Sequence, residues 1–308
     1  MSVERYAPFL SFLGLPPELR ALFGPRVGLL PIPYDLTTSY QPGARRGPIA
    51  LLEASCHLET YDEELGLDLS ELLQLETLAP IVPDTSGPEV TMARIEEVAR
   101  EVLQQGLFLV GVGGEHSVTS PLVKAVCHHH PKLGVLQLDA HADLREDFEG
   151  SPFNHACVMK RILDLGLPLA QVGVRSLSRE EHELMKSRGI VTVFAPEATE
   201  APLETWLPRV LDALPEEIYI TVDLDVFDPA IMPSTGTPEP GGLLWNRALA
   251  ILRAVCRAKR VVAFDVVELA PLPGFVAADF LAAKLLYKLL GYSFLGSGAL
   301  AHRGQPPV

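Results

Sequence analysis

Six short, nearly continuous apolar runs constrain the fold more than any other feature of the sequence. Each run has the length of a β-strand, and none alternates regularly between apolar and polar residues. Runs of this kind indicate strands that are covered on both faces of a sheet. They span residues 26–32, 106–112, 133–138, 169–174, 217–222 and 260–267.

Segments with helical spacing of apolar residues lie between these runs. Residues 92–106 show this spacing and end at a glycine, which is a common helix C-cap. Residues 178–189 open with Ser178 and Glu181, the spacing of a capping box. Two further helical segments are expected at residues 246–259 and 279–291. The alternation predicts an α/β fold with three α/β/α layers and a mostly parallel central sheet.

The domain organisation follows from length and from the absence of a linker. A chain of 308 residues is long enough for two domains, but no Pro/Gly/Ser-rich stretch divides it and no internal repeat is visible. With 48% hydrophobic residues it can bury a large core. We therefore expect one domain over residues 1–308, with an N-terminal extension at about 1–25 and a loose C-terminal tail at about 296–308.

Composition excludes several classes of function. A net charge of −14 argues against nucleic-acid binding, which needs a basic face, and it is compatible with a cationic substrate. No apolar run reaches the roughly 18 residues of a membrane span, and the first residues lack the pattern of a signal peptide. Four widely spaced cysteines without a CxxC pair fit reduced thiols, so we expect a cytoplasmic protein.

Ionisable side chains follow four of the predicted strands at their carboxyl ends. Because open parallel sheets bind ligands at that edge, these side chains are expected to lie together. They are His116, Asp139, His141, Asp143, Asp223, Asp225 and Glu268.

The first six of these residues provide four carboxylates and two imidazoles, a set that suits metal ions. Crowded carboxylates repel each other unless cations are present, and two divalent ions balance four negative charges. Oxygen and imidazole ligands favour Mn²⁺ over Zn²⁺ or Cu²⁺, although Fe²⁺ or Co²⁺ would also fit. A water molecule between two ions becomes a hydroxide near neutral pH, which is hydrolytic chemistry.

Catalytic roles can be assigned to three residues on this basis. Asp143 is expected both to bind metal and to orient the hydroxide. His155, twelve residues further along the chain, is a candidate proton shuttle to the leaving group. Glu268 is not needed as a ligand, and its carboxylate can hold a planar cation by paired hydrogen bonds.

Three sequence blocks resemble the signature blocks of the ureohydrolases, the arginase–agmatinase family. They are GGEHS at 113–117, DAHAD at 139–143 and TVDLDVFDPAIMPSTGTPEPGG at 221–242. The resemblance covers most of the chain. It implies the arginase-like fold, hydrolysis of a guanidino compound to urea and an amine, two Mn²⁺ ions, and a homo-oligomer such as a trimer or hexamer.

The resemblance also implies how the ligands are shared. Asp139 and Asp223 would bridge the two ions. His116 and Asp143 would complete one site, and His141 and Asp225 the other. Glu268 matches the family's guanidinium-binding glutamate, and His155 its proton-shuttling histidine.

Other stretches point to the agmatinase branch of the family. Arg145, Ser176 and Ser178 stand where arginases carry residues that recognise the amino-acid end of arginine. Arg145 is thus a candidate substrate-binding residue, and agmatine, hydrolysed to putrescine and urea, is the favoured substrate. Aminopropylagmatine and guanidinobutyrate are alternatives. A catalytically silent metal-binding relative and a single-zinc deacetylase are the alternatives from other classes.

The signature blocks contain three departures. Thr221 replaces the common serine, which is a mild change. Ser234 stands where the family has glycine in PGTGTP, which is expected to alter a loop near the metals. Glu115 stands in place of an aspartate, and we expect it to contact the metal ligands without binding metal itself. Residues 128–130, three consecutive histidines, are interpreted as surface residues at the C-terminus of a helix.

Overall fold

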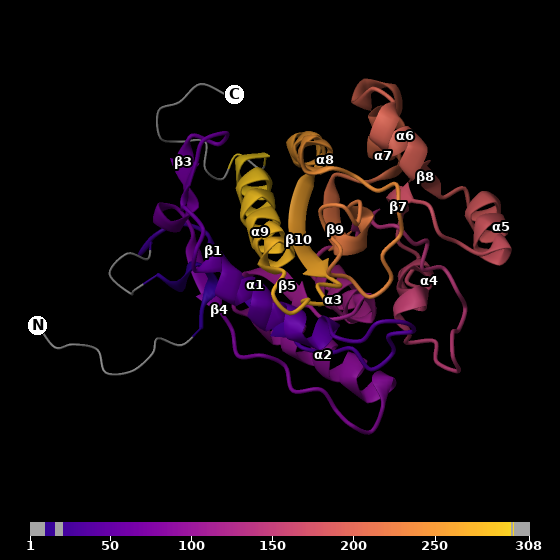
Figure 1. Ribbon diagram of the computed structural model, residues 1–308, viewed down its shortest axis with the longest axis horizontal. Helices are drawn as coiled ribbons and strands as arrows, with labels where there is room; N and C mark the ends of the chain where they lie inside the picture. The colour runs from indigo at the N-terminus through magenta and orange to yellow at the C-terminus, as the bar shows by residue number, and fades with distance from the viewer. Residues whose placement is uncertain (1–9, 16–20, 297, 299–308) are drawn as a thin grey trace, which may run out of the picture.

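The computed structural model describes residues 10–15, 21–296 and 298, and these are built around one eight-stranded sheet (Figure 1). The strand order is β4-β1-β5-β10-β9-β6-β7-β8, and every neighbouring pair is parallel. The strands are β1 (Arg26–Ile32), β4 (Gln74–Thr77), β5 (Phe108–Gly113), β6 (Gly134–Leu138), β7 (Leu169–Val174), β8 (Val191–Phe194), β9 (Glu217–Asp223) and β10 (Arg260–Val267). The predicted parallel α/β fold is therefore confirmed, and all six predicted strands are present.

The sequence reading missed the two edge strands, β4 and β8. Each has only four residues, and most of their side chains are partly or fully exposed. Edge strands lack a neighbour on one side, so they do not need the continuous apolar run that marks a central strand. An antiparallel pair, β2 (Tyr61–Asp62) with β3 (Leu67–Asp68), was missed for a similar reason, since each strand has two residues.

Helices cover both faces of the sheet and give the predicted three layers (Figure 1). One apolar core lies between the sheet and α1 (Gly47–Ser55), α6 (Ala195–Glu200), α7 (Leu203–Ala213), α8 (Trp245–Ala258) and α9 (Val276–Gly296). A second core lies under α2 (Pro88–Gln104), α3 (Thr119–Cys127), α4 (Val158–Asp164) and α5 (Arg179–Arg188). Among the described residues, no helix is both long and apolar enough to cross a membrane.

Local signals placed several helix ends correctly. Ser178 and Glu181 form the predicted capping box of α5, and Gly189 ends that helix in the left-handed conformation with φ 65°. Helix α3 ends at Cys127, so the three histidines follow its C-terminus as predicted. The predicted tail lies almost wholly outside the described residues. Because one sheet takes in strands from Arg26 to Val267, we propose that the chain forms a single domain.

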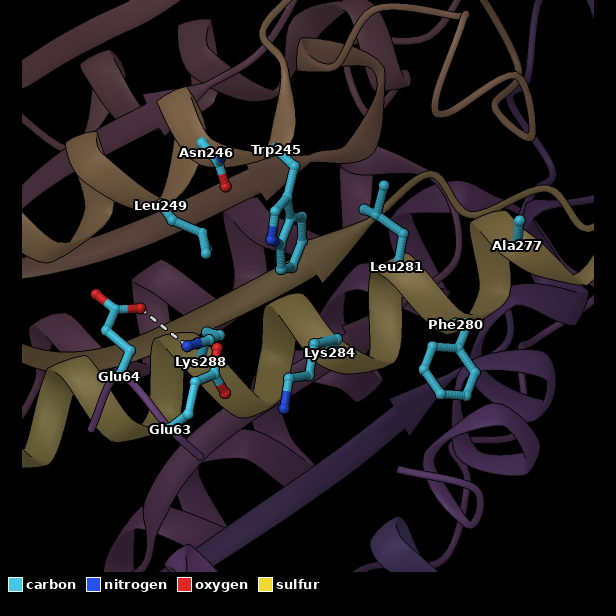
Figure 2. Close-up of a pocket in the computed structure, with 10 residues that line it drawn as sticks. All are labelled: Glu63, Glu64, Trp245, Asn246, Leu249, Ala277, Phe280, Leu281, Lys284 and Lys288. Atoms are coloured by element: carbon cyan, nitrogen blue, oxygen red, sulfur yellow. Dashed lines mark hydrogen bonds and ion pairs between the residues drawn. The ribbon is translucent and has the colours of Figure 1, made fainter. Parts of the chain in front are cut away.

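A cavity of about 430 Å³ lies between α8, α9 and the turn that joins β2 to β3 (Figure 2). Trp245 and Phe280 line it, together with Glu63 and Glu64 from the turn. Lys288 of α9 is buried beside it and lies 2.8 Å from carboxylate oxygens of both Asp62 and Glu64. These contacts attach the small hairpin to the main body of the fold.

The order of the central strands explains how the site is assembled. Strands β5, β10, β9 and β6 are consecutive neighbours in the sheet. They are also the four strands that carry the predicted site residues at or just beyond their carboxyl ends. Residues separated by as many as 152 positions in the chain are therefore brought to one edge.

Candidate metal centre

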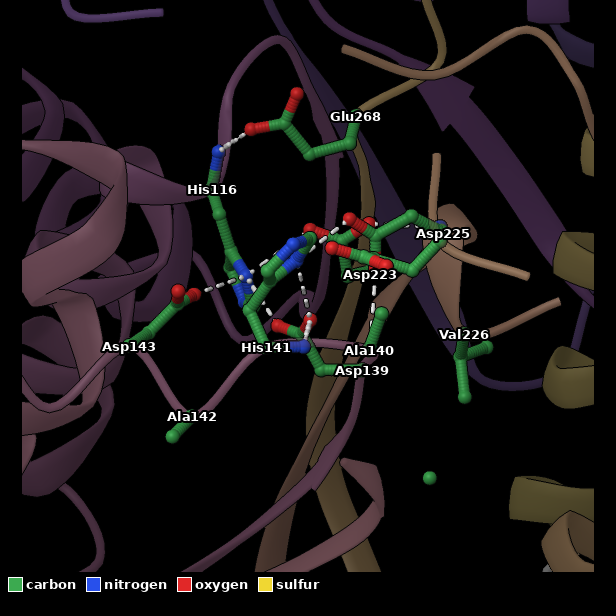
Figure 3. Close-up of polar contacts among 12 residues, drawn as sticks. His116, Asp139, Ala140, His141, Ala142, Asp143, Asp223, Asp225, Val226 and Glu268 are labelled. Carbon is green, nitrogen blue, oxygen red and sulfur yellow. Dashed lines mark hydrogen bonds and ion pairs between the residues drawn. The ribbon is translucent and has the colours of Figure 1, made fainter. Parts of the chain in front are cut away.

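His116 lies at the centre of the first group of side chains (Figure 3). Its Nδ1 atom is 2.9 Å from Oδ2 of Asp139, 3.1 Å from Oδ2 of Asp143 and 3.2 Å from Oδ2 of Asp223. Its Nε2 atom lies 2.9 Å from the hydroxyl of Thr221. Nδ1 is buried and has no hydrogen-bond partner within the described part of the chain. One imidazole nitrogen thus faces three carboxylate oxygens without a hydrogen bond to any of them.

A second group shares Asp139 with the first. Nδ1 of His141 lies 3.5 Å from Oδ1 of Asp139 and 2.9 Å from Oδ2 of Asp225. In each group of His116, Asp139 and Asp223, and of Asp139, His141 and Asp225, the candidate ligand atoms lie within 4.8 Å of one another. The two oxygens of Asp139 therefore face different histidines, which is the arrangement of a bridging carboxylate.

The two-residue spacing in these motifs has a local structural cause. Oδ1 of Asp139 accepts a 2.6 Å hydrogen bond from the main-chain N–H of His141. Oδ1 of Asp223 accepts one of 2.8 Å from the N–H of Asp225. Each strand thus ends in a turn closed by the aspartate side chain, and this turn directs the next ligand toward the same space.

Burial and crowding shift the acidities of these groups strongly. Burial and the neighbouring charge of Asp139 raise the pKa of Asp143 to about 7. Burial, followed by the charges of Asp225 and Asp139, raises the pKa of Asp223 well above its usual value. Burial lowers the pKa of His116, but three carboxylates outweigh it and raise that pKa well above the usual value. A buried cluster of this kind needs positive charge to keep its carboxylates ionised.

The donor set fits divalent metal ions. If Nε2 of His116 carries the proton and donates to Thr221, Nδ1 presents a lone pair to three carboxylate oxygens. Lone pairs that converge in this way repel each other, and a cation between them turns the repulsion into coordination. The residues present therefore suit a metal in both groups.

Glu268 lies beside the first group and is tied to it. Its Oε1 accepts a 2.7 Å hydrogen bond from the main-chain N–H of His116. Its other oxygen, Oε2, lies beside Gly236, where an added Cβ would be 3.4 Å from it. Burial and the nearby Glu115 carboxylate raise the pKa of Glu268 well above its usual value. A bound cation would therefore relieve an unfavourable negative charge.

His155 lies outside the two groups and has contacts of its own. Its Nε2 is 3.0 Å from the hydroxyl of Ser39, and its N–H donates to the hydroxyl of Thr37. Burial, together with the positive charges of His141 and His116, lowers the pKa of His155 to about 4. The imidazole is thus neutral at physiological pH, a state from which it can accept a proton. Its role as a shuttle stays a prediction.

Comparison with known proteins identifies the family. The arginase family model matches residues 25–291. The chain belongs to the arginase family. An N(1)-aminopropylagmatine ureohydrolase of Synechocystis sp. is 41% identical over 272 residues, which cover 86% of this chain and 88% of that protein. An agmatinase of Pyrococcus horikoshii is 38% identical over 267 residues, covering 86% and 91%.

A solved structure of the family confirms the arginase-like fold. The proclavaminate amidino hydrolase from Streptomyces clavuligerus superposes with a TM-score of 0.84 at 30% identity, covering 97% of this chain and all of that one. As a member of the arginase family, the chain is a ureohydrolase of guanidino compounds.

The three residues that we expect to distinguish agmatinases from arginases, Arg145, Ser176 and Ser178, have contacts within this chain. The guanidinium group of Arg145 lies 4.8 Å from the centre of the Phe148 ring, and its Nε is 4.0 Å from Oε2 of Glu181. Ser178 caps α5, and the N–H of Ser176 donates to the carbonyl of Ala140. A contact between Arg145 and substrate stays a prediction.

The three departures from the family blocks, Glu115, Thr221 and Ser234, are buried. Oxygens of Glu115 accept hydrogen bonds from the N–H of Thr37 at 2.7 Å and from the hydroxyl of Ser117 at 2.5 Å. Glu115 thus supports the loops around the site. The carbonyl of Ser234 accepts from the N–H of Ala270, while its hydroxyl has no hydrogen-bond partner among the residues described.

Sequence reasoning missed two residues that hold the site in place. Arg175 donates hydrogen bonds to the main-chain carbonyls of Asp225, Phe227 and Glu239, and so anchors the loop after β9. Gln137 donates to Asp139 from within β6. The available signals were the arginine that follows the apolar run of β7, and a single amide within the apolar run of β6.

Proposed function

We propose that this chain hydrolyses N(1)-aminopropylagmatine to urea and spermidine. The sequence alone favoured agmatine, but the comparisons support the aminopropyl alternative better. The Synechocystis relative and a 42% identical protein of Thermus thermophilus both carry the name N(1)-aminopropylagmatine ureohydrolase, ahead of the agmatinases. The observation that carries the hydrolytic chemistry is the carboxylate of Asp139, which is shared between two His/Asp groups.

The proposed cofactor is a pair of Mn²⁺ ions, one in each group. His116 and Asp143 would hold one ion, His141 and Asp225 the other, and Asp139 and Asp223 both. When bound, two such ions supply a Lewis-acid centre that lowers the pKa of water toward about 7. Support for this assignment comes from Nδ1 of His116, which faces three carboxylate oxygens.

Glu268 is the proposed anchor for the guanidinium group. Its carboxylate is buried, one oxygen is fixed by the N–H of His116, and the other lies beside Gly236. A planar guanidinium can donate two parallel hydrogen bonds to such a carboxylate. This contact would place the guanidinium carbon beside the His/Asp groups.

Asp143 and His155 are the proposed proton-handling residues. Asp143 would orient the attacking oxygen by accepting its hydrogen bond. The oxygen would first bond to the guanidinium carbon, which becomes tetrahedral. The O–H proton would then pass to Asp143 as the bond from that carbon to the alkyl nitrogen breaks. His155 would carry a proton to this nitrogen, so that a neutral or protonated amine leaves and urea remains. The neutral imidazole and its contact with exposed Ser39 suit a residue that exchanges protons with solvent.

Agmatine remains the second candidate substrate because the Pyrococcus relative is named agmatinase. The two substrates share the guanidinium group and differ by one aminopropyl unit, so both would use Glu268. Urea release should be measured with Mn²⁺ on aminopropylagmatine, agmatine, guanidinobutyrate and arginine. We expect the highest kcat/KM for aminopropylagmatine. A higher value for agmatine would contradict the substrate assignment, and no urea from any compound would contradict the whole proposal.

Metal content, measured together with urea release, separates the remaining alternatives. A catalytically silent relative would bind metal without turnover of any of the four compounds. A deacetylase would bind a single zinc ion. We expect two Mn²⁺ per chain together with urea release. We also propose a homo-oligomer, a trimer or hexamer, which light scattering of the purified chain would measure directly.

A further inference from the structure

A row of polar side chains crosses the interior of the sheet directly below the two His/Asp groups. It runs over five neighbouring strands at one register, so each member lies opposite the next. The members are Thr192 on β8, Gln171 on β7, Gln137 on β6, Thr221 on β9 and Asp265 on β10. All except Thr192 are fully buried. Buried polar residues in a parallel sheet are costly unless each is hydrogen-bonded.

Three of the five members of this row form a chain of donors that points toward Asp139. The hydroxyl of Thr192 donates to Oε1 of Gln171 at 3.2 Å. Nε2 of Gln171 donates to Oε1 of Gln137 at 2.6 Å. Nε2 of Gln137 then donates to Oδ2 of Asp139 at 2.6 Å. Each amide oxygen accepts and each amide nitrogen donates, so the chain has a single consistent direction.

The remaining amide hydrogens are also used. Nε2 of Gln171 donates to the carbonyl of Ala142, and Nε2 of Gln137 to the carbonyl of His141. If Gln137 were rotated by half a turn, its oxygen would face both the Asp139 carboxylate and a carbonyl, which repels. Gln171 therefore favours, together with Asp139 and the carbonyl of His141, the orientation in which the Gln137 nitrogen meets Asp139.

The two oxygens of Asp139 are held in matching ways. Oδ2 accepts from Gln137 and lies 2.9 Å from Nδ1 of His116. Oδ1 accepts from the main-chain N–H of His141 and lies 3.5 Å from the ring of that residue. Each oxygen thus has one N–H donor behind it and one histidine in front. Without Gln137, only the Oδ1 side of the carboxylate would be fixed.

We propose that Gln137, oriented by Gln171, is a positioning residue that keeps one oxygen of Asp139 in each metal group. This inference rests on the proposed function, because it takes Asp139 as the ligand shared by two ions. Loss of the donor would free Asp139 to turn about its Cβ–Cγ bond and to leave one group. Residues that orient metal ligands typically change metal affinity by about 10- to 100-fold when replaced.

Gln137→Met is the principal test, since methionine keeps the length and unbranched shape but removes both amide atoms. Gln171→Met is the second variant, because it leaves Gln137 in place without its orienting partner. Gln74→Met is the matched control. Gln74 lies on edge strand β4 and donates to the carbonyl of Gly24, away from the His/Asp groups.

Mn²⁺ alone is the probe, titrated into the metal-free full chain by calorimetry. Electron paramagnetic resonance at saturating Mn²⁺ then reports whether the two ions are coupled through a bridge. We expect Gln137→Met to bind at least one Mn²⁺ about 10- to 100-fold more weakly and to lose the coupled signal. Gln171→Met should show a smaller loss of the same kind, and Gln74→Met should bind Mn²⁺ like the wild type.

The outcomes separate this inference from the proposed function. If the wild type binds two coupled Mn²⁺ ions and Gln137→Met binds them with unchanged affinity and signal, the inference is overturned and the proposed function stands. If the wild type itself binds fewer than two Mn²⁺, the proposed function fails, and the inference with it. Should Gln137→Met not fold, Gln171→Met decides, and wild-type Mn²⁺ binding by that variant overturns the inference.

Discussion

The main-chain N–H of His116 donates a 2.7 Å hydrogen bond to Oε1 of Glu268. The contact joins the end of β5 to the end of β10, two neighbouring strands. It is supported by a second bond, from the N–H of Glu268 to the carbonyl of Gly114. Glu268 adopts a φ of 66°, which is unusual for a residue with a side chain and is maintained by these contacts. The proposed guanidinium anchor and the proposed metal ligand are therefore one rigid unit.

Glu268→Gln is expected to lower kcat/KM by about 100-fold or more, because a guanidinium would lose its charged partner in a buried site. Mn²⁺ binding should remain, since the glutamine oxygen can still accept from His116. Steady-state urea release and Mn²⁺ titration measure the two effects. Glu183→Gln, at an exposed position on α5, is the matched control. Wild-type kcat/KM in the Glu268 variant would rule out the guanidinium contact.

Asp139→Asn is expected to lose metal and activity together. The amide carries less charge and one of its two ends is a donor, so it cannot bridge two cations. Metal analysis after dialysis and urea release check this prediction. Asp147→Asn, at an exposed position eight residues further on, should retain both. Full activity of the Asp139 variant would refute the bridging role.

His155→Asn should reduce kcat by about 100-fold while KM changes little, since general acid–base groups typically contribute 10²- to 10⁴-fold. The pKa of His155 is lowered to about 4, so the imidazole stays neutral down to mildly acidic pH. The pH profile of kcat should therefore lack, in the variant, the ionisation near pH 4 that belongs to His155 in the wild type. His182→Asn on α5 is the control. A proportional rise in KM with unchanged kcat would indicate substrate binding in place of proton transfer.

Glu64→Gln should destabilise the fold in a pH-dependent way. Burial raises the pKa of Glu64, but Lys288, Tyr292 and Arg253 outweigh it and lower that pKa to about 2 (Figure 2 shows the contact with Lys288). A carboxyl whose pKa is lowered by folding stabilises the protein above its usual pKa, and this stabilisation is lost as pH falls from about 4.5 through about 2. We expect a loss of about 1–2 kcal/mol at neutral pH, allowing for partial exposure.

Denaturant unfolding at several pH values measures that difference. The difference should shrink toward zero as the pH approaches about 2, because the wild-type carboxyl then becomes protonated and neutral, like the glutamine amide. Glu63→Gln, at the adjacent exposed position, should change the free energy of unfolding by less than about 0.5 kcal/mol. An equal effect of both variants at all pH values would contradict the ion-pair explanation.

The sequence predicted the central strands and the residues at their ends for a physical reason. A buried parallel strand must be apolar, so a charged residue directly after it marks its carboxyl end, as Asp139 and Asp223 do. Gln137 was missed because one amide inside an apolar run does not show which strands lie beside it. Its role depends on the register with Gln171, which comes from a distant part of the chain. The hydrogen bonds of Arg175 were missed because every residue has a main-chain carbonyl, so the sequence does not show which of them accept.

The guanidinium group of Arg175 holds the loop after β9 in place by hydrogen bonds to the main-chain carbonyls of Asp225, Phe227 and Glu239. Every residue has a main-chain carbonyl, so these three hydrogen bonds do not depend on which side chains the loop carries. The main-chain path of the loop between 227 and 239 is therefore held by Arg175 without contacts to its side chains, although Gly236 within it lies against Glu268. A substitution at an exposed position of this loop is therefore expected to leave the backbone of Asp225 in place.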